Sequence, residues 1–242
     1  MKINGKNIYS ACCAASLWVG FAVSGYSMGL RSFVALPVEK NGAVARLTLE
    51  RTKGTDTLKT SAAYGVSAHQ TLLFGVHYRL SPAGGNRQGD LSTLYRHITW
   101  REDSTFGTDR LGLLAGVIVP GKKDRDAAVQ AGFVFTHFKK RHEIDIDVLY
   151  QSGLGNRLDG GRYDISWQYR LSPAERPDWG FTQELNTVLE LNGRWLEDSN
   201  ITHQVTVGLQ SVHQKLVVEG GVVRDLNNSK ENRLLFSIRF HL

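Results

Sequence analysis

The chain has 242 residues, a formal net charge of +6 and a mean hydropathy of −0.25. That hydropathy is too low for a bundle of membrane helices, and no run of basic residues is long enough to indicate a nucleic-acid partner. The 25 glycines and only 5 prolines are typical of many strands joined by turns.

The first 27 residues predict export of the protein. Lys2 and Lys6 precede an apolar stretch without charge over residues 8–25, which is the pattern of a secretory signal peptide. A membrane-spanning helix is the alternative interpretation. Cys12 and Cys13 are the two cysteines of the chain and both lie in this segment, so we expect no disulfide in the mature protein.

Residues 28–42 precede the first clear strand pattern. We expect them to form a periplasmic lead, an inserted plug or an extra strand. Pro37 argues against a central strand, because proline cannot donate a hydrogen bond to the sheet.

Residues 43–242 alternate between apolar and polar side chains, as strands do when one face is buried in an apolar medium. The alternation is clearest over 71–81, 142–150, 162–171, 184–195, 201–210 and 234–242. It is weaker over 43–52, 57–68, 89–101, 107–120, 129–139 and 214–225, and within 89–101 neither face is plainly apolar. The pattern predicts an all-β fold, an up-and-down antiparallel transmembrane β-barrel of about 12 strands.

A soluble β-sandwich would show the same alternation. Export, short and nearly uniform strand spacing and an even number of strands favour the barrel. Aromatic residues near the strand ends also favour it, because tyrosine and tryptophan suit the headgroup level of a membrane. They are Tyr78, Tyr150, Tyr163 and Trp195 at one rim, and Tyr169 and Phe240 at the other.

The C-terminal segment LLFSIRFHL keeps a strand pattern to its last residue. Because a closed barrel has no free edge, this strand is expected to pair with the first one. It resembles the terminal strands that the barrel-assembly machinery of the outer membrane recognises, although those usually end in an aromatic residue. The side chains expected to face lipid are Leu234, Phe236, Ile238, Phe240 and Leu242.

Three stretches carry a resemblance to a known family. They are LGLLAGVIVPG at 111–121, HEIDIDVLYQSGLGNRLDGGRYDISWQYRLSP at 142–173 and NTVLELNGRW at 186–195. From about residue 32 to the C-terminus, the chain resembles the outer-membrane transporter-like proteins named for the phenol-degradation meta-pathway. The resemblance rests on strand and turn patterns, and it implies a β-barrel that passes small hydrophobic or aromatic molecules.

Charged residues gather on the faces opposite the apolar ones. Glu143, Asp145 and Asp147 share one strand face and form an acidic column. The set either lines a pore that sorts solutes by charge or forms paired charges that fill a small barrel, and both interpretations stay open. The other expected lumen-lining residues are Asp164, Arg170, Glu184, Glu190, Arg194, Arg79 and Arg239, with Arg46 as a further positive partner.

No motif predicts a cofactor or a metal site. His142 would point away from Glu143 and Asp145 on a strand, so these three residues are not expected to share a metal. A lipid-acting enzyme would need a nucleophile beside a histidine, and no G-x-S-x-G motif occurs.

The sequence predicts a channel or transporter for small solutes in the bacterial outer membrane. A closed structural barrel is the alternative, and an outer-membrane lipid-acting enzyme is the second alternative. The expected partners are outer-membrane lipid and lipopolysaccharide, the barrel-assembly machinery and a small-molecule solute.

Overall fold

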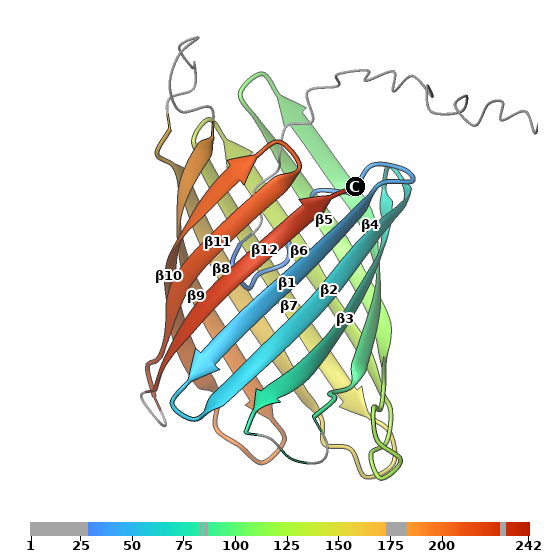
Figure 1. Ribbon diagram of the computed structural model, residues 1–242. Coiled ribbons are helices and arrows are strands. Elements are labelled where there is room, and N and C mark those ends of the chain that lie inside the picture. Colours follow the sequence, from blue (N-terminus) through green and yellow to red (C-terminus); the bar gives the residue numbers. More distant parts are fainter. Residues whose placement is uncertain (1–28, 83, 85–86, 173–182, 228–230) are drawn as a thin grey trace, which may run out of the picture.

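The computed structural model describes residues 29–82, 84, 87–172, 183–227 and 231–242, so the predicted signal peptide lies outside the described residues. Twelve antiparallel strands form one closed barrel (Figure 1). They are β1 (Ala43–Thr52), β2 (Thr55–Ser67), β3 (Gln70–Ser81), β4 (Leu91–Ser104), β5 (Gly107–Val119), β6 (Ala128–Lys139), β7 (His142–Gly153), β8 (Gly160–Arg170), β9 (Glu184–Leu196), β10 (Thr202–His213), β11 (Leu216–Asp225) and β12 (Asn232–His241). The described residues contain no helix long and apolar enough to cross a membrane.

Each strand pairs with its neighbours in sequence, and β12 pairs with β1 to close the barrel. In that closing pair Leu47 lies opposite Ile238, and Arg46 lies opposite Arg239. Closure satisfies the backbone hydrogen bonds of the last strand and removes the sheet edge. The predicted fold class and the pairing of the C-terminal strand with the first strand are confirmed.

The two ends of the barrel differ in their connections. Two-residue turns at 68–69, 105–106, 140–141 and 214–215 lie at the end where β1 begins and β12 ends, which we call the terminus end, and the connection 171–183 between β8 and β9 belongs to the same end. The opposite end, which we call the loop end, carries the connections 53–54, 82–90, 120–127, 154–159, 197–201 and 226–231. Gly54 there has a φ of 92°, a conformation that glycine adopts without steric cost.

The barrel has an inverted distribution of polar residues: unlike a soluble protein, it buries polar side chains and exposes apolar ones. On the closing strand Leu234, Phe236 and Phe240 are 59%, 50% and 43% exposed, whereas the alternate residues Ser237 and Arg239 are fully buried. The largest fully buried side chains include Arg239, Gln168 and Glu190. An apolar exterior around a polar interior is the arrangement that a lipid environment requires.

Strand β4 shows why its sequence was ambiguous. Leu94, Arg96 and Ile98 are buried in the lumen, whereas Tyr95 and Trp100 are exposed on the outer face, with a register shift between Ile98 and Trp100. Both faces of β4 therefore contain apolar residues. The lumen face is apolar because it contributes to a buried hydrophobic cluster inside the barrel.

The outward face of β12 gives a first prediction. Phe236 lies near the middle of the closing strand, opposite Leu49 of β1 and Gly220 of β11. Phe236→Arg should lower the free energy of unfolding by about 2–4 kcal/mol, because a cation at the middle of the bilayer is poorly solvated. Urea unfolding in lipid vesicles, with Phe236→Leu as the matched control, measures the loss. Equal stability of the two variants would contradict the outward orientation.

Candidate functional site in the barrel lumen

Residues 29–38, here called the strap, cross the inside of the barrel. In Figure 1 this segment is the blue trace before β1, and it runs within the ring of strands. Leu30 at one end packs with Val188 and Val223 on the β9–β11 side, and Ala35 packs with Leu94 in the cluster on the opposite wall. The strap therefore spans the lumen from one wall to the other.

The wall has a socket for Leu30. Gly208 of β10 and Gly221 of β11 lie directly opposite each other, and both positions face the lumen. A Cβ atom at Gly208 would lie 2.5 Å from Leu30 Cδ1, and one at Gly221 would lie 3.0 Å away. The two glycines therefore provide the space that this strap side chain occupies.

Carboxylates of the wall accept hydrogen bonds from the strap backbone. Arg31 N donates to Glu190 Oε1 at 3.1 Å, and Phe33 N donates to Asp147 Oδ2 at 2.8 Å. These N–H groups have no sheet partner, so the carboxylates satisfy donors that would otherwise be buried without one. Glu190 and Asp147 were both predicted to line the lumen, and the structure places them against the strap.

Arginines of the wall donate to the carbonyl groups of the strap. Arg46 Nη1 donates to Gly29 O at 3.3 Å, and Arg96 Nη2 donates to Leu36 O at 2.9 Å. The Arg162 guanidinium lies 4.1 Å from the centre of the Phe33 ring, within the range of a cation–π contact. Both kinds of backbone polar group in the strap thus have side-chain partners of the appropriate charge.

Asp145 joins the strap through one intervening hydroxyl. Ala35 N donates to Thr136 Oγ1 at 2.8 Å, and Thr136 Oγ1 donates to Asp145 Oδ1 at 2.6 Å. Gln168 Nε2 donates to the other carboxylate oxygen of Asp145 at 3.0 Å. Glu143, the third member of the predicted acidic column, is 4% exposed, so all three carboxylates lie on the lumen side of β7.

A second group of charges surrounds Asp164, which lies opposite Asp147 in the β7–β8 register. Arg194 Nη2 lies 2.7 Å from Asp164 Oδ1. Arg162 lies between the two carboxylates, 3.5 Å from Asp147 Oδ1 and 3.3 Å from Asp164 Oδ2. Asn192 Nδ2 also donates to Asp164 at 2.6 Å, so the carboxylates are paired.

The closing seam has its own ion pairs. Arg46 and Arg239 face each other across β1 and β12, and Glu219 of β11 pairs with both. The Arg46 Nη2–Glu219 Oε2 distance is 2.6 Å, and Gln210 Nε2 donates to Glu219 Oε1 at 2.8 Å. One carboxylate therefore separates two guanidinium groups that would otherwise repel each other.

The remaining predicted lumen residues lie apart from the strap. Arg170 and Glu184 form an ion pair at the terminus end, with 3.1 Å between Arg170 Nη2 and Glu184 Oε2. Arg79 is exposed on β3 near the loop end. His142 stacks against Trp167, with 6.1 Å between ring centroids, on the outer side of the wall. The described residues contain no group of metal-ligating side chains that could hold a metal ion.

A chamber of about 600 Å³ lies beside the strap. It extends toward the loop end, since the loop residues Asp90 and Arg157 line it. Its walls differ in character. The apolar wall comprises Leu73, Leu94, Ile118 and Leu149, and the cationic residues include Lys59, Arg96, Arg162 and Arg194.

Asp90 joins three loops at the loop end of the chamber. It accepts hydrogen bonds from Gly121 N at 3.1 Å and from Arg125 Nη1 at 3.0 Å, and Arg157 Nη2 lies 2.9 Å from it. The charges of both arginines and the backbone hydrogen bond therefore tie the connections 82–90, 120–127 and 154–159 together.

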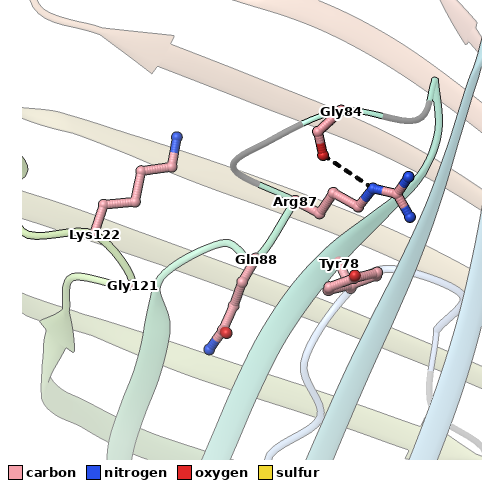
Figure 2. Close-up of a pocket in the computed structure, with 6 residues that line it drawn as sticks. All are labelled: Tyr78, Gly84, Arg87, Gln88, Gly121 and Lys122. Carbon is pink, nitrogen blue, oxygen red and sulfur yellow. Dashed lines mark hydrogen bonds between the residues drawn. The ribbon is translucent and has the colours of Figure 1, made fainter.

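A smaller cavity of about 460 Å³ lies at the loop end, against Tyr78 (Figure 2). Arg87 Nε donates to Gly84 O at 3.2 Å in its wall, and the Lys122 side chain lies across the cavity. No strap residue lines it. It is separate from the lumen chamber.

Sequence reasoning missed several residues that hold the strap and the closing seam. Arg96 lies in the strand whose faces could not be assigned, and Glu219 lies in one of the weaker strand patterns. Thr136 is uncharged and did not stand out as a candidate. The available signal for Thr136 and Glu219 was their position in the period-two pattern, opposite the apolar face, whereas the pattern did not assign a side to Arg96.

Comparisons with known proteins agree with this architecture. No family model matches the sequence, and no curated protein matches it. Among solved structures, the KdgM porin in complex with disordered oligogalacturonate is similar to the chain with a TM-score of 0.54 and 10% identity, covering 81% of this chain and 98% of the porin. The COG4313 outer membrane channel from Pseudomonas putida F1 is similar with a TM-score of 0.53 and 14% identity, covering 87% of this chain and 98% of the channel.

The fold and the inverted distribution of polar residues define this chain as a β-barrel protein of the bacterial outer membrane. The structural likeness extends to almost the full length of both proteins reported above.

The ion pairs at the closing seam give a second prediction. Glu219→Gln should lower the free energy of unfolding by about 3–5 kcal/mol, because it leaves buried guanidinium groups without their carboxylate. Asp56→Asn is the control, since it breaks the Arg51–Asp56 pair, in which the Arg51 side chain is 62% exposed. That control should lose far less stability. Denaturant unfolding in detergent compares the two, and losses of similar size would contradict the importance of the seam.

The loop-end cluster gives a prediction on pH. Burial alone would raise the pKa of Asp90, but the Gly121 N–H and the Arg125 and Arg157 guanidinium groups outweigh it and lower the pKa below the usual 3.8. The cluster should therefore be fully stabilising above pH 3.8 and lose this contribution as the pH falls through the lower folded-state pKa. The amide proton shift of Gly121 reports the titration by NMR.

Arg125→Gln should move that midpoint upward, because it removes one of the cations that favour the carboxylate. Asp90→Asn should abolish the titration at Gly121 altogether. A wild-type midpoint at or above 3.8 would contradict the contacts of Asp90.

Proposed function

We propose that the protein is an outer-membrane channel for small solutes, and that the strap limits passage through it. The observation that carries this proposal is the combination of a polar lumen, a chamber of about 600 Å³ and a non-covalently held segment that crosses the lumen. The barrel wall is complete without the strap, because the twelve strands close among themselves. Displacement of the strap would therefore widen the lumen and leave the wall intact.

The similar structures support a channel over an enzyme, since the two proteins reported above are named as a porin and an outer membrane channel. In outer-membrane barrels the short turns face the periplasm. We therefore propose that the terminus end is periplasmic and that the chamber lies toward the cell exterior. Lipopolysaccharide would then surround the loop end, and the barrel-assembly machinery would act on β12.

The predicted lumen residues take two roles in this proposal. While the strap crosses the lumen, Glu190 and Asp147 hold it in place. After the strap is displaced, the acidic column on β7, which includes Asp147, would line the passage. The resemblance to transporter-like proteins of the phenol-degradation meta-pathway supports a hydrophobic or aromatic solute. The apolar wall of the chamber, with Leu94 and Leu149, supports it as well.

A closed structural barrel is the second candidate, and the packing of the lumen favours it. Gln168, Gln210, Glu190 and Asn192 are among the largest fully buried side chains, so the region around the strap is filled. The two candidates differ in one respect that can be measured. A channel conducts when the strap is removed, whereas a barrel filled by its own wall does not.

Deletion of residues 31–36 should raise single-channel conductance in planar bilayers severalfold, because it removes the part of the strap that crosses the lumen. A paired variant, Ala35→Cys with Thr136→Cys, tests the opposite state. These residues are in contact, with 2.8 Å between Ala35 N and Thr136 Oγ1. Under oxidising conditions this variant should conduct no more than the wild type. Low conductance of the deletion variant, in barrels with normal heat-modifiable gel mobility, would favour the closed barrel.

A further inference from the structure

Arg96 lines the chamber beside Leu94 of the apolar wall, and its environment differs from those of the chamber's other described cations. It is 2% exposed and donates to Val34 O, Leu36 O and Thr71 Oγ1, all of which are neutral acceptors. Among the described residues, no carboxylate forms an ion pair with Arg96, and its Nε atom has no hydrogen-bond partner. Arg96 is therefore a buried positive charge whose hydrogen-bond acceptors are two backbone carbonyl groups and one hydroxyl group.

The nearby cations are already compensated. Lys59 Nζ lies 2.6 Å from Glu50 Oε1, and Arg194 lies 2.7 Å from Asp164. Arg162 lies within 3.5 Å of two carboxylates. Among the described residues, the two acidic residues that line the chamber are Glu50 and Asp90, and both are paired with cations, so this part of the chain offers no free carboxylate there to a cationic ligand.

The surroundings of Arg96 are apolar. Leu94 and Ile98 flank it on the lumen face of β4, and Leu114 and Leu149 belong to the same buried cluster. The cluster and the chamber share Leu94 and Leu149, so the guanidinium group and the apolar wall lie at one site. A ligand there would meet the guanidinium group of Arg96, which has no paired carboxylate in the described part of the chain, and an extended hydrophobic surface.

We propose that the chamber binds a monocarboxylate with a compact apolar body, and that Arg96 binds its carboxylate group. The inference rests on the proposed function, since it names the solute class of the channel. A carboxylate forms charge-assisted, bidentate hydrogen bonds with a guanidinium group, and these are stronger than the bonds to neutral carbonyls that Arg96 now makes. The ligand therefore competes with Val34 and Leu36 of the strap for Arg96, and binding loosens the strap from the apolar wall.

The test compares ligands that share a body and differ in charge. The purified barrel in detergent is titrated calorimetrically with 3-phenylpropionate, 3-phenylpropan-1-ol and 3-phenylpropylammonium, and with acetate as the carboxylate without an aromatic body. We expect 3-phenylpropionate to bind at least about tenfold more tightly than each of the other three, because only it satisfies both the charge and the apolar wall. Equal affinity of the acid, the alcohol and the ammonium ion would overturn the inference.

Three variants assign the binding to Arg96. Arg96→Gln should weaken 3-phenylpropionate binding at least about tenfold, whereas Arg96→Lys should retain part of it. Arg101→Gln is the matched control, because Arg101 is an exposed residue of the same strand outside the chamber and should leave binding unchanged. If Arg96→Gln fails to fold, the wild-type ligand series still decides the question.

Deletion of residues 31–36 tests the competition between ligand and strap. It should tighten 3-phenylpropionate binding, because Val34 and Leu36 are then absent from Arg96, and unchanged affinity would overturn the competition. Conductance separates this inference from the proposed function. A barrel that conducts without preferring 3-phenylpropionate over the other three ligands would overturn the inference alone. A barrel that binds 3-phenylpropionate but never conducts would overturn the proposed channel alone.

Discussion

The architecture depends on a charge conflict where the barrel closes. The register of β1 and β12 brings Arg46 and Arg239 opposite each other on the lumen side, and Glu219 of the adjacent strand lies between them. Like charges in that position destabilise a strand pair, so closure requires the shared carboxylate. Arg46 also donates to the carbonyl groups of Gly29 and Leu30. The interaction that closes the wall is therefore connected directly to the strap.

The lumen contains a charged region and an apolar region, and the strap contacts both. Asp147 of β7 and Glu190 of β9 accept the N–H groups of the strap. Strands β4–β7 contribute the apolar cluster, into which Ala35 packs. Leu30 packs into a second apolar cluster, with Val188 of β9 and Val223 of β11. These contacts locate the strap by charge, by hydrogen bonds and by shape together.

The wall of the barrel was predictable because a strand with one lipid-facing side repeats its signal along its whole length. Leu234 to Leu242 show this most clearly, and their pairing with β1 follows from closure alone. Strand β4 was not predictable to the same degree, because Leu94 and Ile98 face the lumen and belong to an apolar cluster that includes Ala35 of the strap, a residue outside every period-two pattern. The charged positions were found on the lumen side, but their partners depend on register and on the strap. Glu184, for example, pairs with Arg170 at the terminus end.

The strap precedes every strand in the chain, yet many of its contacts are with distant strands. The contacts of Arg31 with Glu190 and of Phe33 with Asp147 join residues separated by 159 and 114 positions. The socket for Leu30 forms only when Gly208 and Gly221 are paired. The first described part of the chain to be synthesised therefore has no complete binding site until nearly all of the barrel is in place. Its docking is consequently a late event in assembly, and an occupied lumen marks a barrel whose wall is already finished.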